Sequence, residues 1–331
     1  MMETLEGGEL CFPQLLNTSC RKQKHPHSEA MFLYILLSSI SLLTVVLNLL
    51  VIISVSHYRQ LHTPTNLLLL SLAVSDFLNG LLLIPTEILF IVSCWFLGDF
   101  MCVLYYFVAF IIISASVGNM VLISVDRYVA ICDPLCYPTK ITQRRVKICV
   151  CLCWVCPAFW CGLLLKDLLR QPGRYNSCIG ECVVVHNYIT GAVDLVLTFI
   201  GPITVIIVLY MRVFVVAVSQ ARAMRSHIVA VTLQRSVTVT AKKSERKAAR
   251  TLGIVIAVFL ICFCPFSCLS LAGEDILTTI LSEAFVIALY YFNSCLNPVI
   301  YAFFYPWFRK AIKHIVTLQI LQPDSCEANI L

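Results

Sequence analysis

Residues 31–56 read MFLYILLSSISLLTVVLNLLVIISVS, and they contain no charged side chain. A helix rises about 1.5 Å per residue, so this stretch is long enough to cross the hydrocarbon core of a bilayer, which needs about 20 apolar residues. Residues 148–165 and 251–273 are also free of charged side chains. These three stretches alone predict three membrane-spanning helices.

Four further apolar stretches contain isolated polar or acidic side chains. They lie at about 65–92, 102–125, 188–211 and 282–304, and they bring the expected number of spans to seven. The composition agrees, because 60% of the residues are hydrophobic and only 13% are charged. We therefore predict an all-α membrane protein, a bundle of seven transmembrane helices, and not a soluble domain.

Positive charge is distributed unevenly among the segments that join the spans. Of the 24 Lys and Arg residues, 18 lie in one alternating set of segments, and six lie in the other set. Segments rich in Lys and Arg stay on the cytoplasmic side, which places the N-terminus outside. The net charge of +6 follows from this asymmetry, so nucleic-acid binding is not expected. The positive segments are 57–64, 126–147, 212–250 and 305–331.

This orientation divides the chain into three parts. We expect an extracellular segment at 1–30, the transmembrane bundle at 31–304, and a cytoplasmic amphipathic helix with a tail at 305–331. The first 28 residues lack the apolar core of a cleavable signal peptide, so the first span would direct membrane insertion.

Polar motifs recur inside the expected spans, where an uncompensated charge is costly. Asn48 lies in the first span and Asp76 in the second. The third span ends at Asp126-Arg127-Tyr128, and the seventh contains the sequence from Asn297 to Tyr301, NPVIY. Such residues in a membrane are functional by default, because burying them in hydrocarbon is otherwise unfavourable.

With these motifs the chain resembles the rhodopsin-like, G-protein-coupled receptors over nearly its whole length. The segment 293–308, NSCLNPVIYAFFYPWF, is similar to the fingerprint of trace amine-associated receptors. The resemblance implies binding of a small amine and coupling to a heterotrimeric G protein of the stimulatory or olfactory type. It also implies contacts with arrestin, a receptor kinase and membrane lipids, a plasma membrane location that includes olfactory cilia, no enzymatic activity and no obligatory cofactor.

The resemblance implies an allosteric sodium site in the middle of the bundle. Asp76, Ser116, Asn293 and Asn297 stand at the positions that surround the ion in this family, and their oxygen atoms suit a hard cation. A buried hydrogen-bond network with water and no ion is the alternative.

The resemblance also implies a switch at the cytoplasmic end. An ion pair between Arg127 and Glu245 would hold this end closed until activation, because a pair of this kind is better suited to a two-state latch than to stabilising the fold. The implied switch residues are Asp126, Arg127, Tyr128, Glu245, Tyr210, Asn297, Pro298 and Tyr301.

Two disulfides are implied by the same resemblance. Cys102 and Cys182 stand where the family joins the third span to the second outer loop, and Cys20 to Cys178 corresponds to an extra bridge of trace amine-associated receptors. Cys11 remains the alternative partner of Cys178. Asn17 begins the sequon Asn-Thr-Ser and is a predicted glycosylation site if the N-terminal segment is extracellular.

The ligand anchor departs from the common pattern. Receptors for amines usually hold the ammonium with an aspartate eighteen residues before the Arg of Asp-Arg-Tyr, and this chain has Ala109 there. Asp194, eight residues before Pro202, supplies an acid in the outer half of the fifth span, where it should face the bundle. Some fish-type relatives look similar in this exchange. We therefore predict that Asp194 binds the ammonium, the alternative being internal pairing with Thr190 or Thr198.

Aromatic side chains and two further acids complete the predicted pocket. Phe263 stands where most relatives have Trp, so an aromatic switch would persist in altered form. Glu87 and Glu283 lie near the outer mouth, either as solvated rim charges or as a site for the second ammonium of a diamine. The predicted ligand-binding set is Asp194, Ala109, Phe110, Phe263, Phe266, Tyr291, Glu87 and Glu283.

Other functions fit the sequence less well. A receptor for a lipid, steroid or neutral odorant is the second hypothesis, because Ala109 removes the usual acid. A transporter or channel is disfavoured, because repeated halves and several pore-lining charges are missing from the sequence. An enzyme is disfavoured because no metal-binding or nucleophilic set of residues accompanies Asp76 and Asp194.

Overall fold

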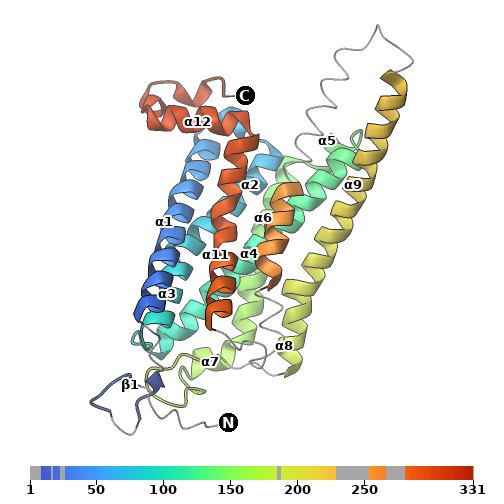
Figure 1. Ribbon diagram of the computed structural model, residues 1–331. Helices are drawn as coiled ribbons and strands as arrows, with labels where there is room; N and C mark the ends of the chain where they lie inside the picture. The colour runs from blue at the N-terminus through green and yellow to red at the C-terminus, as the bar shows by residue number, and fades with distance from the viewer. Residues whose placement is uncertain are drawn as a thin grey trace.

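Long helices packed side by side form the body of the molecule (Figure 1). The computed structural model describes residues 9–15, 18–22, 27–184, 188–228, 253–265 and 280–330. Six described helices are long and apolar enough to cross a membrane, and Gly253–Pro265 forms a shorter apolar helix within the predicted sixth span. The expected bundle is therefore present.

Several spans consist of more than one helical segment. The second is α2 (Pro64–Leu78), continued by a π-helical turn, η2 (Asn79–Leu83), and by α3 (Ile84–Val92). The fifth is α8 (Tyr188–Leu195), a second π-helical turn, η3 (Val196–Ile200), and α9 (Gly201–Ile228). The other long helices are α1 (His27–His57), α4 (Asp99–Cys132), α6 (Gln143–Leu164) and α11 (Ile280–Phe304).

Helix boundaries follow local chemistry. The side chain of Thr63 caps α2 by accepting a hydrogen bond from the Asn66 amide, and Pro64 occupies the first turn, where its missing N–H costs nothing. Gly98, with φ of 83°, makes the turn before α4 that other residues rarely adopt. At its other end α4 continues past the apolar stretch and the Asp126-Arg127-Tyr128 motif to Cys132.

The interior and the surface of the bundle have the polarity expected in lipid. Large apolar side chains such as Phe159 and Phe303 are more than two-thirds exposed, at 71% and 75%. In contrast, Asn48, Asp76 and Asn297 are at most 1% exposed. Lipid solvates the apolar surface, whereas buried polar groups must find partners inside the protein.

Three disulfides mark one end of the bundle, which we call the disulfide end. Cys102–Cys182 and Cys20–Cys178 form as predicted, and Cys11 bonds to Cys94, a pairing that the sequence analysis missed. The short strands β1 (Glu9–Leu10) and β2 (Arg21–Lys22) pair in an antiparallel hairpin beside them. The loop after α7 (Lys166–Arg170) joins this N-terminal segment through Ile179, whose carbonyl accepts from the Cys20 amide and whose amide donates to the Thr18 carbonyl. Disulfides thus join the N-terminal segment to the loop that contains Cys94 and to the loop that contains Cys178.

The opposite end carries α12 (Pro306–Val316), the amphipathic helix expected at 306–316 (Figure 1). Trp307, Phe308 and Ala311 are buried on one side of it, and basic residues lie on the other side. We call this the α12 end. The tail turns back through the short helices η5 (Gln319–Leu321) and η6 (Ser325–Glu327), where Glu327 pairs with Arg59 at 3.1 Å.

Candidate functional site

A cavity of about 450 Å³ lies near the disulfide end of the bundle. Its volume is in the range of small-molecule sites, and its walls are mostly apolar and aromatic. Four predicted ligand residues line it: Glu87, Ala109, Phe110 and Tyr291. The other described lining residues are Phe90, Tyr105, Tyr106, Ile113, Cys161, Leu164, Leu165, Val184 and Tyr290.

Glu87 on α3 is held by two tyrosines from other helices. Its carboxylate accepts hydrogen bonds from the hydroxyl of Tyr105 on α4, at 3.4 Å, and from that of Tyr291 on α11, at 3.3 Å. The side chain is partly buried. Glu87 therefore belongs to the cavity wall, where two tyrosine hydroxyls orient its carboxylate.

Asp194 is the penultimate residue of α8, just before the π-helical turn η3. Its Oδ1 accepts a hydrogen bond of 3.1 Å from the indole Nε1 of Trp160 on α6. Thr198 donates to the main-chain carbonyl of Asp194, at 2.7 Å. The sequence analysis missed Trp160, although an indole N–H near the same depth was a visible candidate partner for an acid.

Asp194 is not among the described residues that line the cavity. Its hydrogen-bond donor Trp160 nevertheless immediately precedes Cys161, which does line the cavity. Asp194 is thus adjacent to the cavity wall on the α6 side, whereas Glu87 is part of the wall itself.

Aromatic rings connect this cavity to the middle of the bundle. Phe263 stacks on Phe259 with 5.1 Å between ring centroids, and it lies 5.6 Å from Tyr290 and 5.9 Å from Phe199. Tyr290 lines both the ligand cavity and a smaller cavity beside Asp76. Phe266 and the side chain of Glu283 lie outside the described residues.

The smaller cavity brings the predicted sodium residues together. Asp76, Ser116 and Asn293 line it, and Asn297 donates a hydrogen bond of 2.8 Å to Oδ2 of Asp76. Within the described structure, Oδ1 of Asp76 and the amide oxygens of Asn293 and Asn297 are buried without hydrogen-bond partners. The volume of about 20 Å³ is enough for one water-sized particle. The donor set fits a hard cation, which prefers oxygen ligands.

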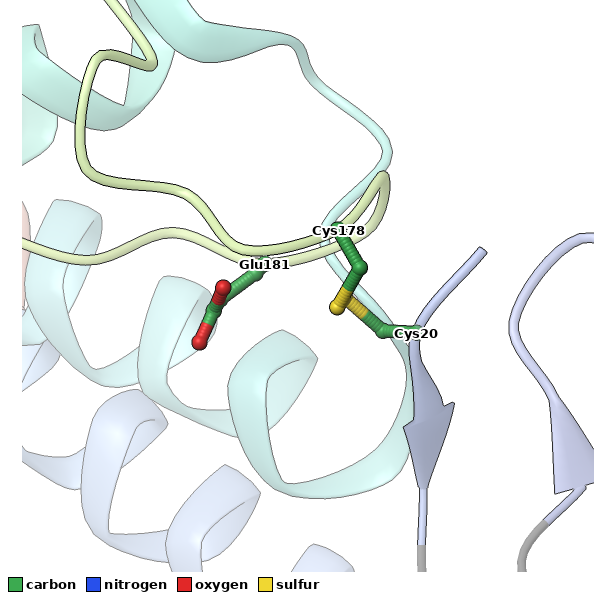
Figure 2. Close-up of side chains that lie close together, drawn as sticks. All are labelled: Cys20, Cys178 and Glu181. Carbon is green, nitrogen blue, oxygen red and sulfur yellow. A yellow bond between two sulfur atoms is a disulfide. The ribbon is translucent and has the colours of Figure 1, made fainter. Parts of the chain in front are cut away.

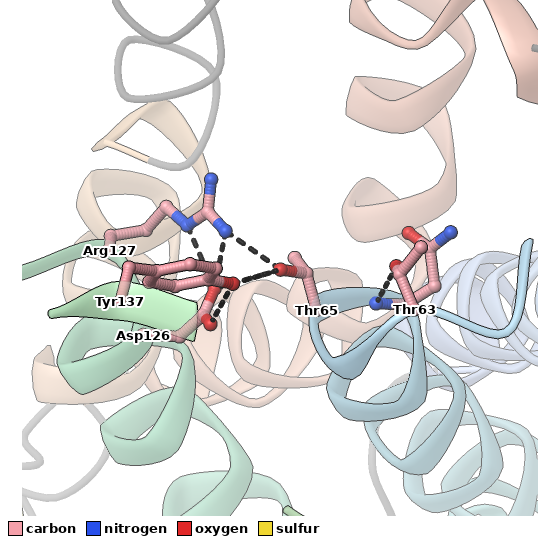
Figure 3. A network of polar contacts seen from close by, with 6 residues as sticks. Thr63, Thr65, Asp126, Arg127 and Tyr137 are labelled. Carbon is pink, nitrogen blue, oxygen red and sulfur yellow. Dashed lines mark hydrogen bonds and ion pairs between the residues drawn. The ribbon is translucent and has the colours of Figure 1, made fainter. Parts of the chain in front are cut away.

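Near the α12 end, Asp126 and Arg127 lie in a compact polar network (Figure 3). Asp126 is almost fully buried and forms an ion pair with Arg127. Thr65 at the start of α2 donates to Oδ2 of Asp126 at 3.0 Å and accepts from Arg127 at 2.8 Å. Tyr137 on α5 (Tyr137–Lys140) donates to Oδ1 at 2.9 Å. Burial raises the pKa of Tyr137, so its phenol stays protonated and able to donate.

The predicted partner of Arg127, Glu245, lies outside the described residues. Sequence reasoning missed both Thr65 and Tyr137, because neither belongs to the Asp-Arg-Tyr motif. Among the other switch residues, Tyr210 packs so closely on Gly253 that a Cβ there would overlap the phenol ring. Tyr301 is 1% exposed and contacts Tyr305, with 5.9 Å between ring centroids.

One group of potential metal ligands lies at the disulfide end. The side chains of Cys20, Cys178 and Glu181 have ligand atoms within 4.8 Å of one another. Figure 2 shows that the two sulfur atoms are bonded together, with the Glu181 carboxylate beside them. Metal sites use thiolates, so the disulfide removes these two ligands. Glu181 accepts a hydrogen bond from the Ser177 amide at 2.7 Å. The predicted glycosylation site Asn17 lies outside the described residues.

Comparison with known proteins gives a consistent result. Residues 47–301 match the 7 transmembrane receptor (rhodopsin family) model. The chain is 38% identical to trace amine-associated receptor 13c of Danio rerio, an alignment that covers 98% of this chain and 97% of that protein. It is 38% identical to trace amine-associated receptor 5 of Rattus norvegicus, with 95% and 94% covered, and 37% identical to trace amine-associated receptor 1 of Mus musculus, with 96% and 98% covered.

The family model covers the chain from Asn48 to the NPVIY segment, and the alignments with the relatives cover nearly its whole length. The family is one of receptors, which confirms the expectation that the protein is not an enzyme. This chain belongs to the rhodopsin family of seven-transmembrane receptors and, within it, to the trace amine-associated receptors.

Proposed function

We propose that this protein is a receptor for small amines, with Asp194 as the anchor for the ligand ammonium. The observation that carries this proposal is the hydrogen bond from Trp160 to Asp194, which fixes an acid beside a ligand-sized aromatic cavity. The printed names of the relatives support an amine as the ligand class. An ammonium desolvated in an apolar site needs a counter-ion and benefits from nearby aromatic faces.

The position of Asp194 suits a residue that transmits binding. It lies next to the π-helical turn η3, and π-helical turns occur frequently at functional sites. A ligand that forms an ion pair with Asp194 would shift the fifth span, which continues as α9 to the α12 end. Ligand binding would shift the bundle towards an arrangement in which Arg127 is released from Asp126.

Signalling then follows from exposure of Arg127. The released guanidinium would contact a heterotrimeric G protein of the stimulatory or olfactory type, and activation of that G protein would raise cAMP. The predicted ion pair between Arg127 and Glu245 would break in the same transition. An arrestin and a receptor kinase would bind the same end afterwards. A sodium ion held by Asp76, Ser116, Asn293 and Asn297 would favour the resting arrangement.

The orientation implied by the charge distribution places the disulfide end outside the cell. Disulfides form in oxidising compartments, so three of them at one end support that side as extracellular. Asn17 would then be accessible for glycosylation. The plasma membrane, including the cilia of olfactory sensory neurons, is the proposed location.

The test compares wild type, Asp194→Asn and a control acid substitution in transfected cells. Asp167→Asn on α7 is a suitable control, because Asp167 is an exposed acid near the same end of the molecule. With a panel of primary amines and a cAMP reporter, Asp194→Asn should weaken potency about ten- to a hundred-fold, the loss expected for a hydrogen-bonded charge pair. Cell-surface expression, measured by an N-terminal epitope, must match wild type.

Unchanged amine potency in Asp194→Asn would contradict the anchor assignment. A wild type that responds to neutral odorants or lipids and to no amine would instead favour the second hypothesis, which Ala109 on the cavity wall supports.

A further inference from the structure

We propose that Glu87 is a second ammonium-binding site, separate from Asp194, and that the preferred ligands are therefore diamines. This inference rests on the proposed amine receptor function and deepens it by naming the ligand class. The cavity wall formed by Glu87, Tyr105 and Tyr291 carries it.

The first step is the placement of the two acids. Glu87 lies on α3 and faces the cavity between α4 and α11, whereas Asp194 lies on α8 against α6. Cys161 on α6 belongs to the cavity wall and follows Trp160, which donates a hydrogen bond to Asp194, so Asp194 lies beside the α6 side of the cavity while Glu87 lies on its α3 wall. A molecule with a cationic group at each end can therefore use both carboxylates, while a molecule with one ammonium uses one.

The second step is the chemistry of the contacts on Glu87. Tyr105 and Tyr291 are neutral donors, so their hydrogen bonds orient the carboxylate and leave its negative charge in place. The two bonds, at 3.4 and 3.3 Å, are longer than the usual 2.7–2.8 Å of a hydroxyl donor. An ammonium can replace contacts of this length at small cost, and its own hydrogen bonds to a carboxylate are stronger because they are charge-assisted.

The third step is the aromatic surround. Phe90 lies 5.4 Å from Tyr105 between ring centroids, and Tyr290 lies 5.1 Å from Tyr291, in both cases beside Glu87 on the cavity wall. Tyr106 lines the same cavity. A carboxylate set among aromatic faces is the combination that binds ammonium groups, since cation–π attraction adds to the ion pair.

The fourth step is the absence of an acid at position 109. Ala109 lines the same cavity and is 9% exposed, so a methyl group occupies the wall where an acid usually stands in amine receptors. Tyr291, which lines the cavity with it, donates its hydroxyl to Glu87 on the second span. The negative charge of this wall thus comes from α3 and not from α4.

A structural role for Glu87 is the competing explanation, because the two hydrogen bonds join α3, α4 and α11. The two roles predict different data. If Glu87 only joins the three helices, its substitution should lower the potency of every ligand and the stability of the free receptor. If Glu87 binds an ammonium, its substitution should lower only the potency that the second cationic group of a diamine provides.

The experiment measures wild type and Glu87→Gln with matched probes. The probes are straight-chain diamines from butane-1,4-diamine to octane-1,8-diamine, each paired with the 1-aminoalkane of the same length. Potency is read from cAMP, and binding is read separately from the ligand-induced rise in melting temperature of the purified receptor. Glu87→Gln keeps the size of the side chain and can still accept hydrogen bonds from both tyrosines.

Wild type should prefer the best diamine over its matched monoamine by about ten- to a hundred-fold, and Glu87→Gln should reduce this ratio to about one without weakening the monoamine. Tyr291→Phe keeps the ring and removes one orienting hydroxyl, so it should reduce the ratio partially. Asp194→Asn should weaken monoamines and diamines together, and the exposed-acid control Asp167→Asn should change neither.

Two outcomes overturn the inference in distinguishable ways. If Glu87→Gln retains the diamine preference, or loses monoamine and diamine potency equally, Glu87 is not an ammonium site while the amine receptor function stands. If no amine activates or stabilises the wild type, the proposed function fails and the diamine assignment fails with it.

Discussion

The Asp126 network predicts that removing a single hydroxyl outside the Asp-Arg-Tyr motif raises signalling in the absence of ligand. Tyr137→Phe deletes the donor that lies 2.9 Å from Oδ1 of Asp126 and leaves the ring in place. Asp126 is 1% exposed, so water cannot easily replace the lost donor. The change therefore destabilises the arrangement in which Asp126 holds Arg127.

The magnitude follows from the kind of bond that is lost. A hydrogen bond to a charged group contributes about 1.5–3 kcal/mol, and about 1.4 kcal/mol changes an equilibrium tenfold. If the active arrangement is a minor state of about 1%, Tyr137→Phe should raise it to about 10% or more. Ligand-independent cAMP should then rise by about tenfold at equal surface expression.

Two further variants test whether the network is the cause. Thr65→Val removes the hydroxyl that contacts both Asp126 and Arg127, and it should act in the same direction. Thr139→Val on the same short helix as Tyr137 removes a hydroxyl that bonds only to the Cys136 carbonyl in the described contacts, and it is the matched control. Basal cAMP equal to wild type in both Tyr137→Phe and Thr65→Val, at matched expression, would refute the claim that the Asp126 network holds Arg127 in the inactive arrangement.

Two other predictions follow from the bundle interior and the disulfide end. If Asp76 and its neighbours hold sodium, raising the sodium concentration at constant ionic strength should weaken agonist binding in wild type and leave Asp76→Asn unaffected; equal sodium dependence in both proteins would contradict the site. Replacing Cys11 and Cys94 together by Ser should lower the unfolding free energy by about 2–4 kcal/mol, read as a reduced melting temperature of the purified receptor, because the bridge closes a long loop in the unfolded chain. An unchanged melting temperature would show that this bridge contributes little.

The fold was predictable because membrane insertion imposes a simple rule on sequence. Uncharged stretches such as 31–56 must form helices in lipid, where every backbone group needs an internal hydrogen bond. The helix ends were harder to predict. The helix of the third span, α4, continues to Cys132, beyond the charged residues Asp126 and Arg127. These two side chains form an ion pair within its last turns, so their charges are compatible with a continuous helix.

The polar partners of the site were the part that sequence alone could not supply. Asp76 and Asn297 are 221 residues apart, and their contact was expected through the resemblance to a known family. Trp160 and Tyr137 carry no motif, and their roles follow from helix packing that brings α6 to Asp194 and α5 to Asp126. Cys94 lies just beyond the second span, and its partner could not be chosen without the path of the N-terminal hairpin.

The position of negative charge in the ligand cavity links these observations. The acid that amine receptors usually carry on the third span is replaced by Ala109, and the two acids near the cavity lie on spans that contain π-helical turns. A π-helical turn inserts an extra residue and rotates the following side chains about the helix axis, so it changes which residues face the bundle. Glu87 follows η2 by four residues, and Asp194 precedes η3 by two. The second and fifth spans, which carry the two acids proposed to bind ammonium groups, thus share this irregularity, whereas α4 on the third span is one continuous helix.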